Sequence, residues 1–256
     1  GESFTGPIDE AGGEVIFNTA MTGYQELITD PSYTGQMVCM TWPLVGNYGV
    51  PQFTEENGML RFFESNRIHI RGLVISDYSF EYSHWNAVES LGKWLADNDV
   101  PAICGVDTRQ ITKIIRERGV MLGKVLVEGT PEPEQFVDPN RENLVAQVST
   151  KQAQTYGNGR HRIVLVDCGC KYNIIRCLCD RDATVIRVPW DYATRIRRGD
   201  AVERPRRPAA MRGHGRQHQK GDCARQADLR HLPGQPTAVD RRRSDHLQTE
   251  IRTPQP

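Results

Sequence analysis

The sequence predicts an α/β protein: a mixed sheet with helices, followed by the opening strand, helix and strand of a doubly wound parallel sheet. Alternating strand-like segments and turn signals occupy residues 13–75. Two helical patterns follow between residues 86 and 119, and a strand–helix–strand pattern covers residues 163–188. With 256 residues, the chain is long enough for one large domain or two modest ones.

The first part of the chain predicts strands joined by a distinctive turn. Apolar side chains alternate over residues 13–18 and again over residues 36–42, as expected of strands with one face buried. Between them, Asp30-Pro31 predicts a turn that presents Ser32, because proline fixes its own φ and aspartate accepts local backbone hydrogen bonds. Residues 68–75 predict another strand, interrupted by Gly72.

Two helices are then predicted, with a short strand over residues 102–106 between them. The first begins at a capping box of Asn86 and Glu89, and its apolar face consists of Val88, Leu91 and Leu95. The second begins at Asp107-Thr108 and ends at Gly119, which fits the left-handed position after a helix. Its apolar face consists of Ile111, Ile114 and Ile115.

A second unit is expected after a polar linker. Residues 129–161 are rich in Pro, Gln and Asn and predict that linker, with a possible short helix over residues 142–148. A strand over residues 163–166, a turn, a helix over residues 173–180 and a strand over residues 184–188 then form a βαβ unit. The sequence supplies no further strands after Pro189.

Charge and composition change abruptly near residue 196. The whole chain has no formal net charge, with 32 basic and 32 acidic residues, so nothing global favours nucleic acid or a membrane surface. Residues 1–196 have a net charge of −7 and residues 197–256 one of +7. The latter contain 13 Arg and no aromatic residue, and their apolar residues are not periodic. Such a segment is expected to be disordered.

Several other classes of protein are disfavoured. The chain has no long apolar run and no signal-peptide pattern, and its seven cysteines do not resemble a disulfide framework, so we expect a cytoplasmic protein without a membrane span. The basic tail has no aromatic residue for stacking, so no specific nucleic acid is expected.

The cysteines and histidines predict neither metal sites nor reactive groups. The spacing Cys168, Cys170, Cys177, Cys179 is narrower than in zinc sites, and the last two residues lie on opposite sides of the predicted helix. We therefore expect core thiols there, and packing residues at Cys39 and Cys104. The histidines at positions 69, 84 and 161 are expected to be structural or surface residues. No metal is predicted at the histidines after residue 196 either.

Three blocks of sequence resemble the small subunit of carbamoyl phosphate synthetase. The first runs from Gly13 through Gly-Tyr-Gln-Glu-Leu-Ile-Thr-Asp-Pro-Ser-Tyr to Gly49, and the second is Val-Asp-Thr-Arg-Gln-Ile-Thr-Lys-Ile-Ile-Arg-Glu-Arg-Gly, ending at Gly119. The third, Val-Asp-Cys-Gly-Cys-Lys-Tyr-Asn-Ile-Ile-Arg, ending at Arg176, resembles the start of a class I glutamine amidotransferase domain. The resemblance covers roughly residues 3–196.

The resemblance implies three segments and one site residue. Residues 1–150 correspond to the N-terminal domain of the small subunit, residues 151–196 to the start of the amidotransferase domain, and residues 197–256 to an aberrant tail. Ser32 is implied to bind glutamine. In that family the small subunit hydrolyses glutamine and passes ammonia to a large subunit, which makes carbamoyl phosphate for pyrimidines and arginine. ATP and Mg are used by the large subunit, so no cofactor is expected in this one.

The catalytic part of the family pattern is missing. After the βαβ opening, the pattern includes Ser-Asn-Gly-Pro-Gly-Asp-Pro, then Gly-Ile-Cys-Leu-Gly around the nucleophile, and later His-Pro-Glu. None of these occurs in the 256 residues, so no catalytic residue is assigned and the chain is expected to be inactive as a glutaminase. The alternative is a non-catalytic docking domain that binds the large subunit.

A shifted reading frame accounts for the tail. With synonymous codons chosen for residues 197–211, reading from the second base gives Asp-Gly-Val-Met-Leu-Ser-Asn-Gly-Pro-Gly-Asp-Pro. Residues 229–239 in the same frame give Phe-Gly-Ile-Cys-Leu-Gly-Asn-Gln, and residues 246–256 again give a family-like segment. All three occur in family order, so we hypothesise one insertion or deletion near codons 196–197.

Overall fold

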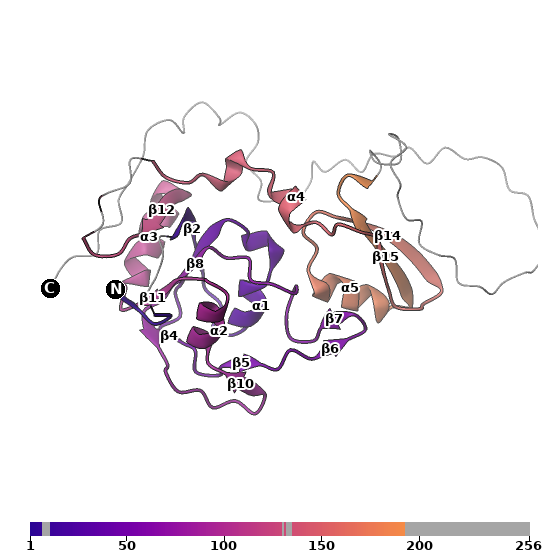
Figure 1. Ribbon diagram of the computed structural model, residues 1–256, viewed down its shortest axis with the longest axis horizontal. Helices are drawn as coiled ribbons and strands as arrows, with labels where there is room; N and C mark the ends of the chain where they lie inside the picture. The colour runs from indigo at the N-terminus through magenta and orange to yellow at the C-terminus, as the bar shows by residue number, and fades with distance from the viewer. Residues whose placement is uncertain (7–10, 130, 132–134, 193–256) are drawn as a thin grey trace, which may run out of the picture. The chain divides into compact units, whose positions relative to one another are not determined.

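The computed structural model describes residues 1–6, 11–129, 131 and 135–192 (Figure 1). The segment expected to be disordered therefore lies outside the described residues. Within them, the main feature is a mixed sheet of six strands, which confirms the predicted α/β class for the first part of the chain. In spatial order these are β1 (Glu2–Ser3), β11 (Ala102–Cys104), β8 (Gly72–Val74), β3 (Gln36–Met40), β2 (Ala11–Asn18) and β12 (Met121–Val125).

The centre of this sheet is parallel and its edges are antiparallel. Strands β2, β3, β8 and β11 pair parallel to one another. Val15 of β2 lies opposite Met37 of β3, and Val38 of β3 lies opposite Leu73 of β8. The outer strands β1 and β12 pair antiparallel with β11 and β2. Parallel strands need covered faces, and β3 accordingly buries Met37, Val38, Cys39 and Met40 in succession.

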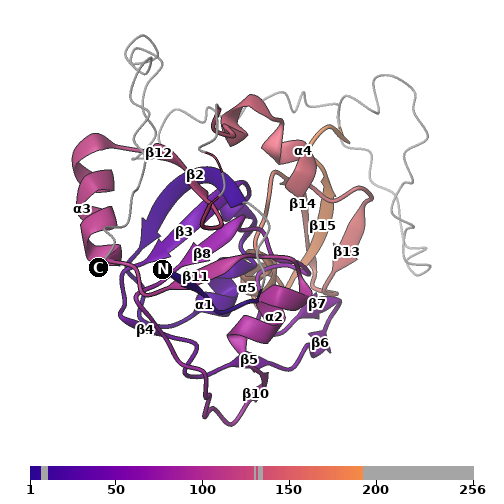
Figure 2. The same ribbon diagram turned by 60° about the vertical axis from the view of Figure 1, so that its left-hand side comes forward.

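Helices cover the sheet on both faces (Figure 2). Helices α1 (Tyr24–Ile28) and α2 (Leu91–Asp97) pack with Val38 and Leu73 in the larger core cluster. Helix α3 (Thr108–Arg118) packs with Met37 and Cys39 on the other face. The alternation along β3 thus serves two cores, because successive side chains of a strand point to opposite faces.

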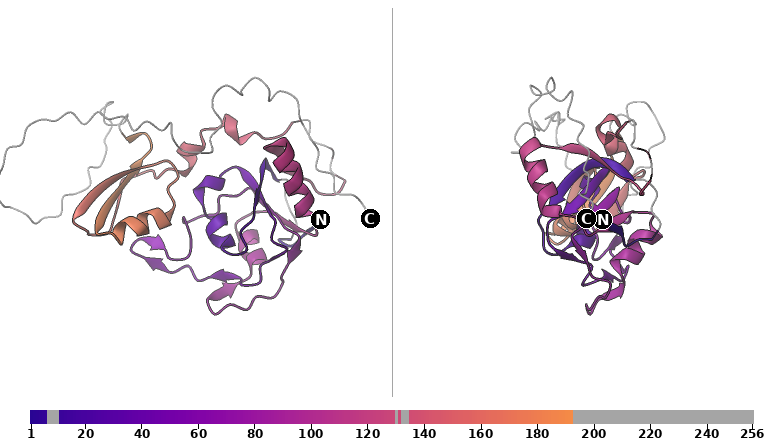
Figure 3. Two further views of the ribbon diagram at one scale, coloured as in Figure 1. Left: turned by 180° about the vertical axis from the view of Figure 1, so that it is seen from behind. Right: turned by 90° about the vertical axis from the view of Figure 1, so that its left-hand side faces the viewer.

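Smaller elements surround the large sheet (Figure 3). The short strands pair β4 (Leu44–Val45) with β9 (Asp77–Tyr78), β5 (Val50–Pro51) with β10 (Ala87–Glu89), and β6 (Glu55–Glu56) with β7 (Met59–Leu60). Single turns of helix are η1 (Pro31–Tyr33), η2 (Pro139–Arg141) and α4 (Leu144–Val148). The predicted short helix over residues 142–148 is therefore confirmed in its later part.

The second predicted unit has its expected strand–helix–strand geometry. Strand β14 (His161–Asp167), helix α5 (Tyr172–Cys179) and strand β15 (Ala183–Pro189) follow one another, and the two strands pair parallel over their full length. Ile163 and Leu165 of β14 pack with Ile175 of α5. Strand β13 (Gln154–Tyr156) pairs antiparallel with β15 and lies inside the predicted linker, so the linker prediction was too long.

Helix boundaries were predicted correctly for α3 and wrongly for α2. The Asp107 carboxylate accepts a hydrogen bond from the Gln110 backbone N–H at 2.8 Å, and Gly119 has a φ of 84°. In contrast, α2 begins after Ser90, whose hydroxyl accepts from the Lys93 N–H at 3.2 Å. The predicted capping box at Asn86 and Glu89 is wrong because residues 87–89 form β10 instead.

The strand predicted over residues 68–75 is shorter than expected. Only Gly72–Val74 forms a strand, and Arg71 makes one further backbone hydrogen bond to Gln36, at 2.7 Å. Within the described residues, no helix is long and apolar enough to cross a membrane.

Candidate functional site

The Ser32 turn is a short 3-10 helix capped by Asp30. The Asp30 Oδ1 atom accepts a hydrogen bond from the Ser32 backbone N–H at 2.9 Å, and its carbonyl oxygen accepts from the Tyr33 N–H at 3.1 Å. Pro31 occupies the first helical position, where a missing N–H costs nothing. The predicted turn is thus confirmed. Ser32 is exposed, and its hydroxyl has no hydrogen-bond partner among the described residues.

A second turn, between β14 and α5, is organised by the fully buried Asp167. Its Oδ1 atom accepts hydrogen bonds from the backbone N–H groups of Gly169 at 3.1 Å and Cys170 at 2.9 Å. Its Oδ2 atom accepts from the Thr150 N–H at 2.5 Å and pairs with the Arg187 guanidinium at 2.7 Å. The carboxylate therefore fixes the path of residues 167–170, as an aspartate does in an Asx turn.

The two turns are in contact. Gly169 has a φ of 100°, and a Cβ atom there would lie 2.9 Å from Val148 Cγ2 and 3.4 Å from Pro31 Cβ. Glycine is required at this point both by its backbone conformation and by the space available. An ion pair joins the same turns, since Lys171 Nζ lies 3.3 Å from Asp30 Oδ2. Asp30 thus caps the Ser32 turn with one oxygen and binds the second turn with the other.

The loop of residues 64–69 connects to both turns. The Glu64 backbone N–H donates to the Thr29 hydroxyl at 3.0 Å, immediately before the Ser32 turn. The Glu64 carbonyl accepts from the Tyr172 N–H at 2.9 Å, and its Oε2 atom accepts from the Asn173 N–H at 2.9 Å. Tyr172 and Asn173 are the first two residues of α5. One loop therefore holds the Ser32 turn and the start of α5 together.

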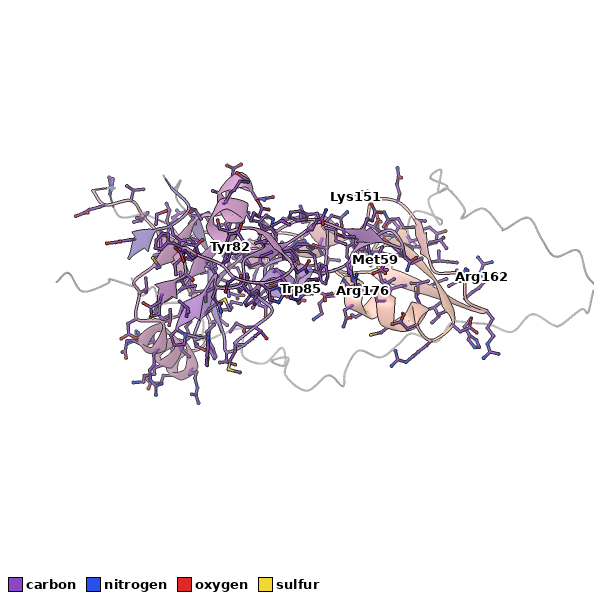
Figure 4. The ribbon with its side chains drawn as sticks, turned by 90° about the horizontal axis from the view of Figure 1, so that it is seen from below. Met59, Tyr82, Trp85, Lys151, Arg162 and Arg176 are labelled. Atoms are coloured by element: carbon purple, nitrogen blue, oxygen red, sulfur yellow. The ribbon has the colours of Figure 1, made fainter. Side chains whose placement is uncertain are left out.

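Arg176 adds a further connection from the middle of α5. Its Nη2 atom donates to the carbonyl oxygens of Phe63 at 2.5 Å and Leu60 at 3.2 Å. Figure 4 shows Arg176 beside Met59 of β7, and Met59 is buried in the same cluster as Ile175. A guanidinium that donates to two carbonyl oxygens fixes the helix against residues 59–63 in both position and direction.

The cysteines near the site differ from the expectation of core thiols. Cys168 is exposed, so the prediction is wrong for this residue: its turn places it outside the cluster that α5 and β14 bury. Cys170 is half-buried, and burial raises the pKa of its thiol to about 11, with Asp167 also raising it and Arg187 opposing the change. Cys177 and Cys179 are likewise half-buried.

Among the described residues, these thiols have neither a histidine partner nor a cluster of further metal ligands. No hydrogen bond joins Cys168 to a histidine in the part of the chain that the structure describes, and the protonated form dominates at Cys170 near neutral pH. Over the same described ranges, no group of three or more potential ligands is arranged to hold a metal ion. Cys39 is a packing residue as predicted, and burial raises its pKa to about 12.

The sequence of the first part of the chain matches a known family model. Residues 1–125 match the family model described as carbamoyl-phosphate synthase small chain, CPSase domain. Among similar proteins, the mitochondrial carbamoyl-phosphate synthase [ammonia] of Homo sapiens is 52% identical over 195 residues. The carbamoyl phosphate synthase arginine-specific small chains of Eremothecium gossypii and Saccharomyces cerevisiae are each 46% identical, over 199 and 187 residues.

The coverage of these relatives is unequal. The alignments include 75% of this chain for the human and Eremothecium proteins and 70% for the Saccharomyces protein. The chain spans 13% of the human protein, and 49% and 45% of the two fungal ones. Since 75% of 256 residues exceeds the 125 residues of the family model, the likeness extends beyond that domain.

These matches define the class of residues 1–125 as a carbamoyl-phosphate synthase domain. More closely, these residues match the CPSase domain of the small chain, and about three quarters of the chain is similar to carbamoyl-phosphate synthases.

Sequence reasoning predicted the turn that presents Ser32 but not the residues that hold this turn in place. The Asp30-Pro31 signal is local and was recognised. The roles of Glu64, Lys171 and Arg176 depend on contacts between segments 100 or more residues apart, for which the sequence offers no signal beyond the resemblance itself.

Proposed function

We propose that this chain derives from the glutamine-hydrolysing small subunit of carbamoyl phosphate synthetase and is inactive as a glutaminase. The observation that supports this most directly is the contact between the Ser32 turn and the turn at residues 167–171. The first lies in the matched domain and the second at the end of β14, the edge at which α/β domains bind ligands. A site built across the two segments needs both turns in this arrangement.

The proposed domain division follows the geometry of the second unit. Residues 1–150 form the small-subunit N-terminal domain, and residues 151–196 begin a class I glutamine amidotransferase domain with the parallel pair β14 and β15. Residues 197–256 are proposed to be translated out of frame. The alignments with the relatives include about three quarters of the chain, so the part that they leave out is about as long as the proposed out-of-frame segment.

In the proposed site Ser32 binds glutamine. Its hydroxyl is exposed and free of partners among the described residues, and its backbone is fixed by Asp30 and Pro31. Because the backbone is already ordered, only the side chain of Ser32 loses conformational entropy when its hydroxyl forms a hydrogen bond with an amide or carboxylate of a ligand. The turn at residues 167–171 lies against the same segment and limits the ligand to one side.

Glutamine hydrolysis also needs groups that this chain lacks. A Cys thiolate attacks the side-chain amide, a His transfers a proton to the leaving ammonia, and backbone N–H groups stabilise the oxyanion. The family's segments for these groups do not occur in the sequence, and Cys168 and Cys170 have no paired histidine among the described residues. The proposed partner is the large subunit, which uses ATP, Mg and the ammonia. A cytoplasmic location is a proposal only, since several relatives, the human protein among them, are named mitochondrial.

The decisive experiment is to sequence the encoding DNA across codons 185–256 and to translate all three frames. A neighbouring frame that reads Ser-Asn-Gly-Pro-Gly-Asp-Pro and then Gly-Ile-Cys-Leu-Gly supports the proposal. Ammonia release from glutamine is then measured for the present chain and for the frame-restored protein, each mixed with a large subunit. We expect activity only from the restored protein. If no frame contains these segments, the out-of-frame origin is wrong.

A docking domain without catalytic function is the second candidate, and one surface favours it. Phe80 is 75% exposed and Trp85 is 85% exposed, both on the segment between β9 and β10. Tyr82 belongs to the same segment and is labelled with Trp85 in Figure 4. Exposed aromatic groups of this size are typical of protein interfaces. Replacing Phe80 and Trp85 by serine should weaken co-elution with the large subunit, while Val120→Ser, at another exposed apolar position, should not.

A further inference from the structure

His69 lies buried behind the Ser32 turn. Its ring is 7% exposed and lies between two hydroxyl groups, with Nδ1 2.9 Å from Thr34 Oγ1 and Nε2 3.0 Å from Ser65 Oγ. Its backbone N–H donates to the Ile28 carbonyl oxygen at 2.9 Å. Ile28 and Thr34 stand on either side of the turn, so one histidine contacts the chain both before and after Ser32.

The two hydroxyl groups connect the ring to the backbone of the turn. The Ser65 hydroxyl donates to the Thr29 carbonyl oxygen at 2.7 Å. The Thr34 hydroxyl lies at 2.8 Å from the Pro31 carbonyl oxygen, to which it donates. The resulting chain of contacts runs from Thr29 through Ser65, the imidazole and Thr34 to Pro31. Both of its ends are carbonyl oxygens within three residues of Ser32 along the chain.

The ring is held in its neutral form. Burial, and to a lesser extent the Arg67 guanidinium, lower the pKa of His69 to about 4, although Asp30 opposes the change. Each hydroxyl has one proton, so two donations to carbonyl oxygens leave both hydroxyls as acceptors towards the ring. A neutral imidazole has only one N–H, so it donates to one hydroxyl, and its other nitrogen accepts only when the second hydroxyl turns its proton from the carbonyl oxygen to the ring. Such a buried chain of hydrogen bonds restricts the motion of the segment that it joins.

We propose that His69 is a positioning residue that fixes the Ser32 turn through Thr34 and Ser65. The inference rests on the proposed function only for the role of Ser32 in binding glutamine. An ordinary core histidine would stabilise the domain as a whole. The contacts of His69 instead converge on residues 28–34, so its loss should loosen that segment first.

The test uses the full 256-residue chain and amide hydrogen exchange. In His69→Ala, exchange at Ser32, Tyr33 and Thr34 should accelerate by roughly tenfold, as expected when one or two net hydrogen bonds are lost. Amides of α3, such as that of Ile115, should keep their rates. His69→Gln retains a donor and an acceptor and should recover part of the protection. His84→Ala, at an exposed histidine, should change nothing.

A milder substitution distinguishes local loosening of the turn from global unfolding. Thr34→Val has the same shape but removes the hydroxyl between His69 and Pro31, and its matched control is Thr112→Val, whose hydroxyl donates within α3 at 2.7 Å. Faster exchange at residues 32–34 in Thr34→Val alone supports the proposal. Unchanged exchange there, or equal acceleration throughout the chain, overturns it.

The outcome is independent of glutamine. Exchange reports the order of the turn in the chain as it exists, whereas the proposed function is tested by ammonia release from the frame-restored protein. Protection that depends on His69, together with a restored protein that never hydrolyses glutamine, would leave the positioning role intact and reject the proposed function. Unchanged protection in the His69 variants, together with ammonia release from the restored protein, would reject the positioning role and leave the proposed function intact.

Discussion

The carboxylate of Asp167 and the guanidinium of Arg187 form a buried ion pair at 2.7 Å, and their side chains are 0% and 9% exposed. Burial lowers the pKa of Arg187, but Asp167 raises it, and the net pKa lies above its ordinary value. Because the same carboxylate also accepts three backbone N–H groups, it joins Thr150, the turn at residues 167–170 and β15.

Removal of the Asp167 charge should therefore destabilise the second unit severely. Asp167→Asn leaves Arg187 as an unpaired buried cation, which we expect to cost on the order of 3–5 kcal/mol in the free energy of unfolding. Urea denaturation followed by circular dichroism measures this cost. Asp182→Asn is the matched control: it breaks an exposed pair with Arg160, also at 2.7 Å, and should cost less than about 1 kcal/mol. Equal costs for the two variants would contradict the role assigned to burial.

Stability should depend on pH through His69. Its folded-state pKa of about 4 lies below the ordinary value of 6.5, so the unfolded chain binds the extra proton between these values. Stability is thus complete above about pH 6.5 and falls as the pH drops towards 4, by up to about 3 kcal/mol. Unfolding curves measured at several pH values give the free energy of unfolding at each pH. Over this window, that free energy should change less with pH in His69→Gln than in the wild-type protein. Parallel slopes would exclude the effect.

Thiol reactivity should separate the cysteines by exposure and pKa. Cys168 is exposed and should react first with a maleimide in the folded protein. Cys170, with its pKa of about 11, should react slowly, and Cys39, with a pKa of about 12, only after unfolding in urea. Peptide mass spectrometry after timed labelling identifies each site. Early modification of Cys39 would show that the core between α3 and the sheet opens readily.

Two adjacent glycines in β2 should respond differently to the same substitution. A Cβ atom at Gly13 would clash with the Gly35 carbonyl oxygen, whereas one at Gly12 would lie 3.6 Å from its nearest neighbours. Gly13→Ala should therefore cost roughly 1–3 kcal/mol through backbone displacement, and Gly12→Ala much less. Thermal unfolding of the two variants compares them directly. A smaller loss of stability in Gly13→Ala than in Gly12→Ala would be inconsistent with the close approach of β2 to Gly35.

The elements that were predicted correctly are those whose signals are local. Asp107 and Gly119 bound α3 because capping involves residues within a few positions of the helix end. The Asp30-Pro31 turn is equally local. The capping box at Asn86 and Glu89 used the same kind of signal and was wrong, because pairing of residues 87–89 with β5 takes precedence over the local preference.

Strand β13 and the support of the candidate site could not be predicted in this way. Strand β13 has three residues, and only its pairing with β15, about 30 positions later, makes it a strand. Glu64 and His69 carry no recognisable sequence signal for holding the Ser32 turn, since an isolated histidine in an apolar stretch is typical of many buried positions. Ser32 itself was found through the family resemblance, and its ligand remains a proposal.

The exposed face of β14 has a consequence for the behaviour of the chain at high concentration. Val164 and Val166 are 62% and 54% exposed on the strand that forms one edge of the small sheet in the described residues. An edge strand that combines unpaired backbone groups with apolar side chains is a template for pairing with another chain. We therefore expect that β14, as the exposed edge strand in the described residues, promotes self-association as the protein concentration rises.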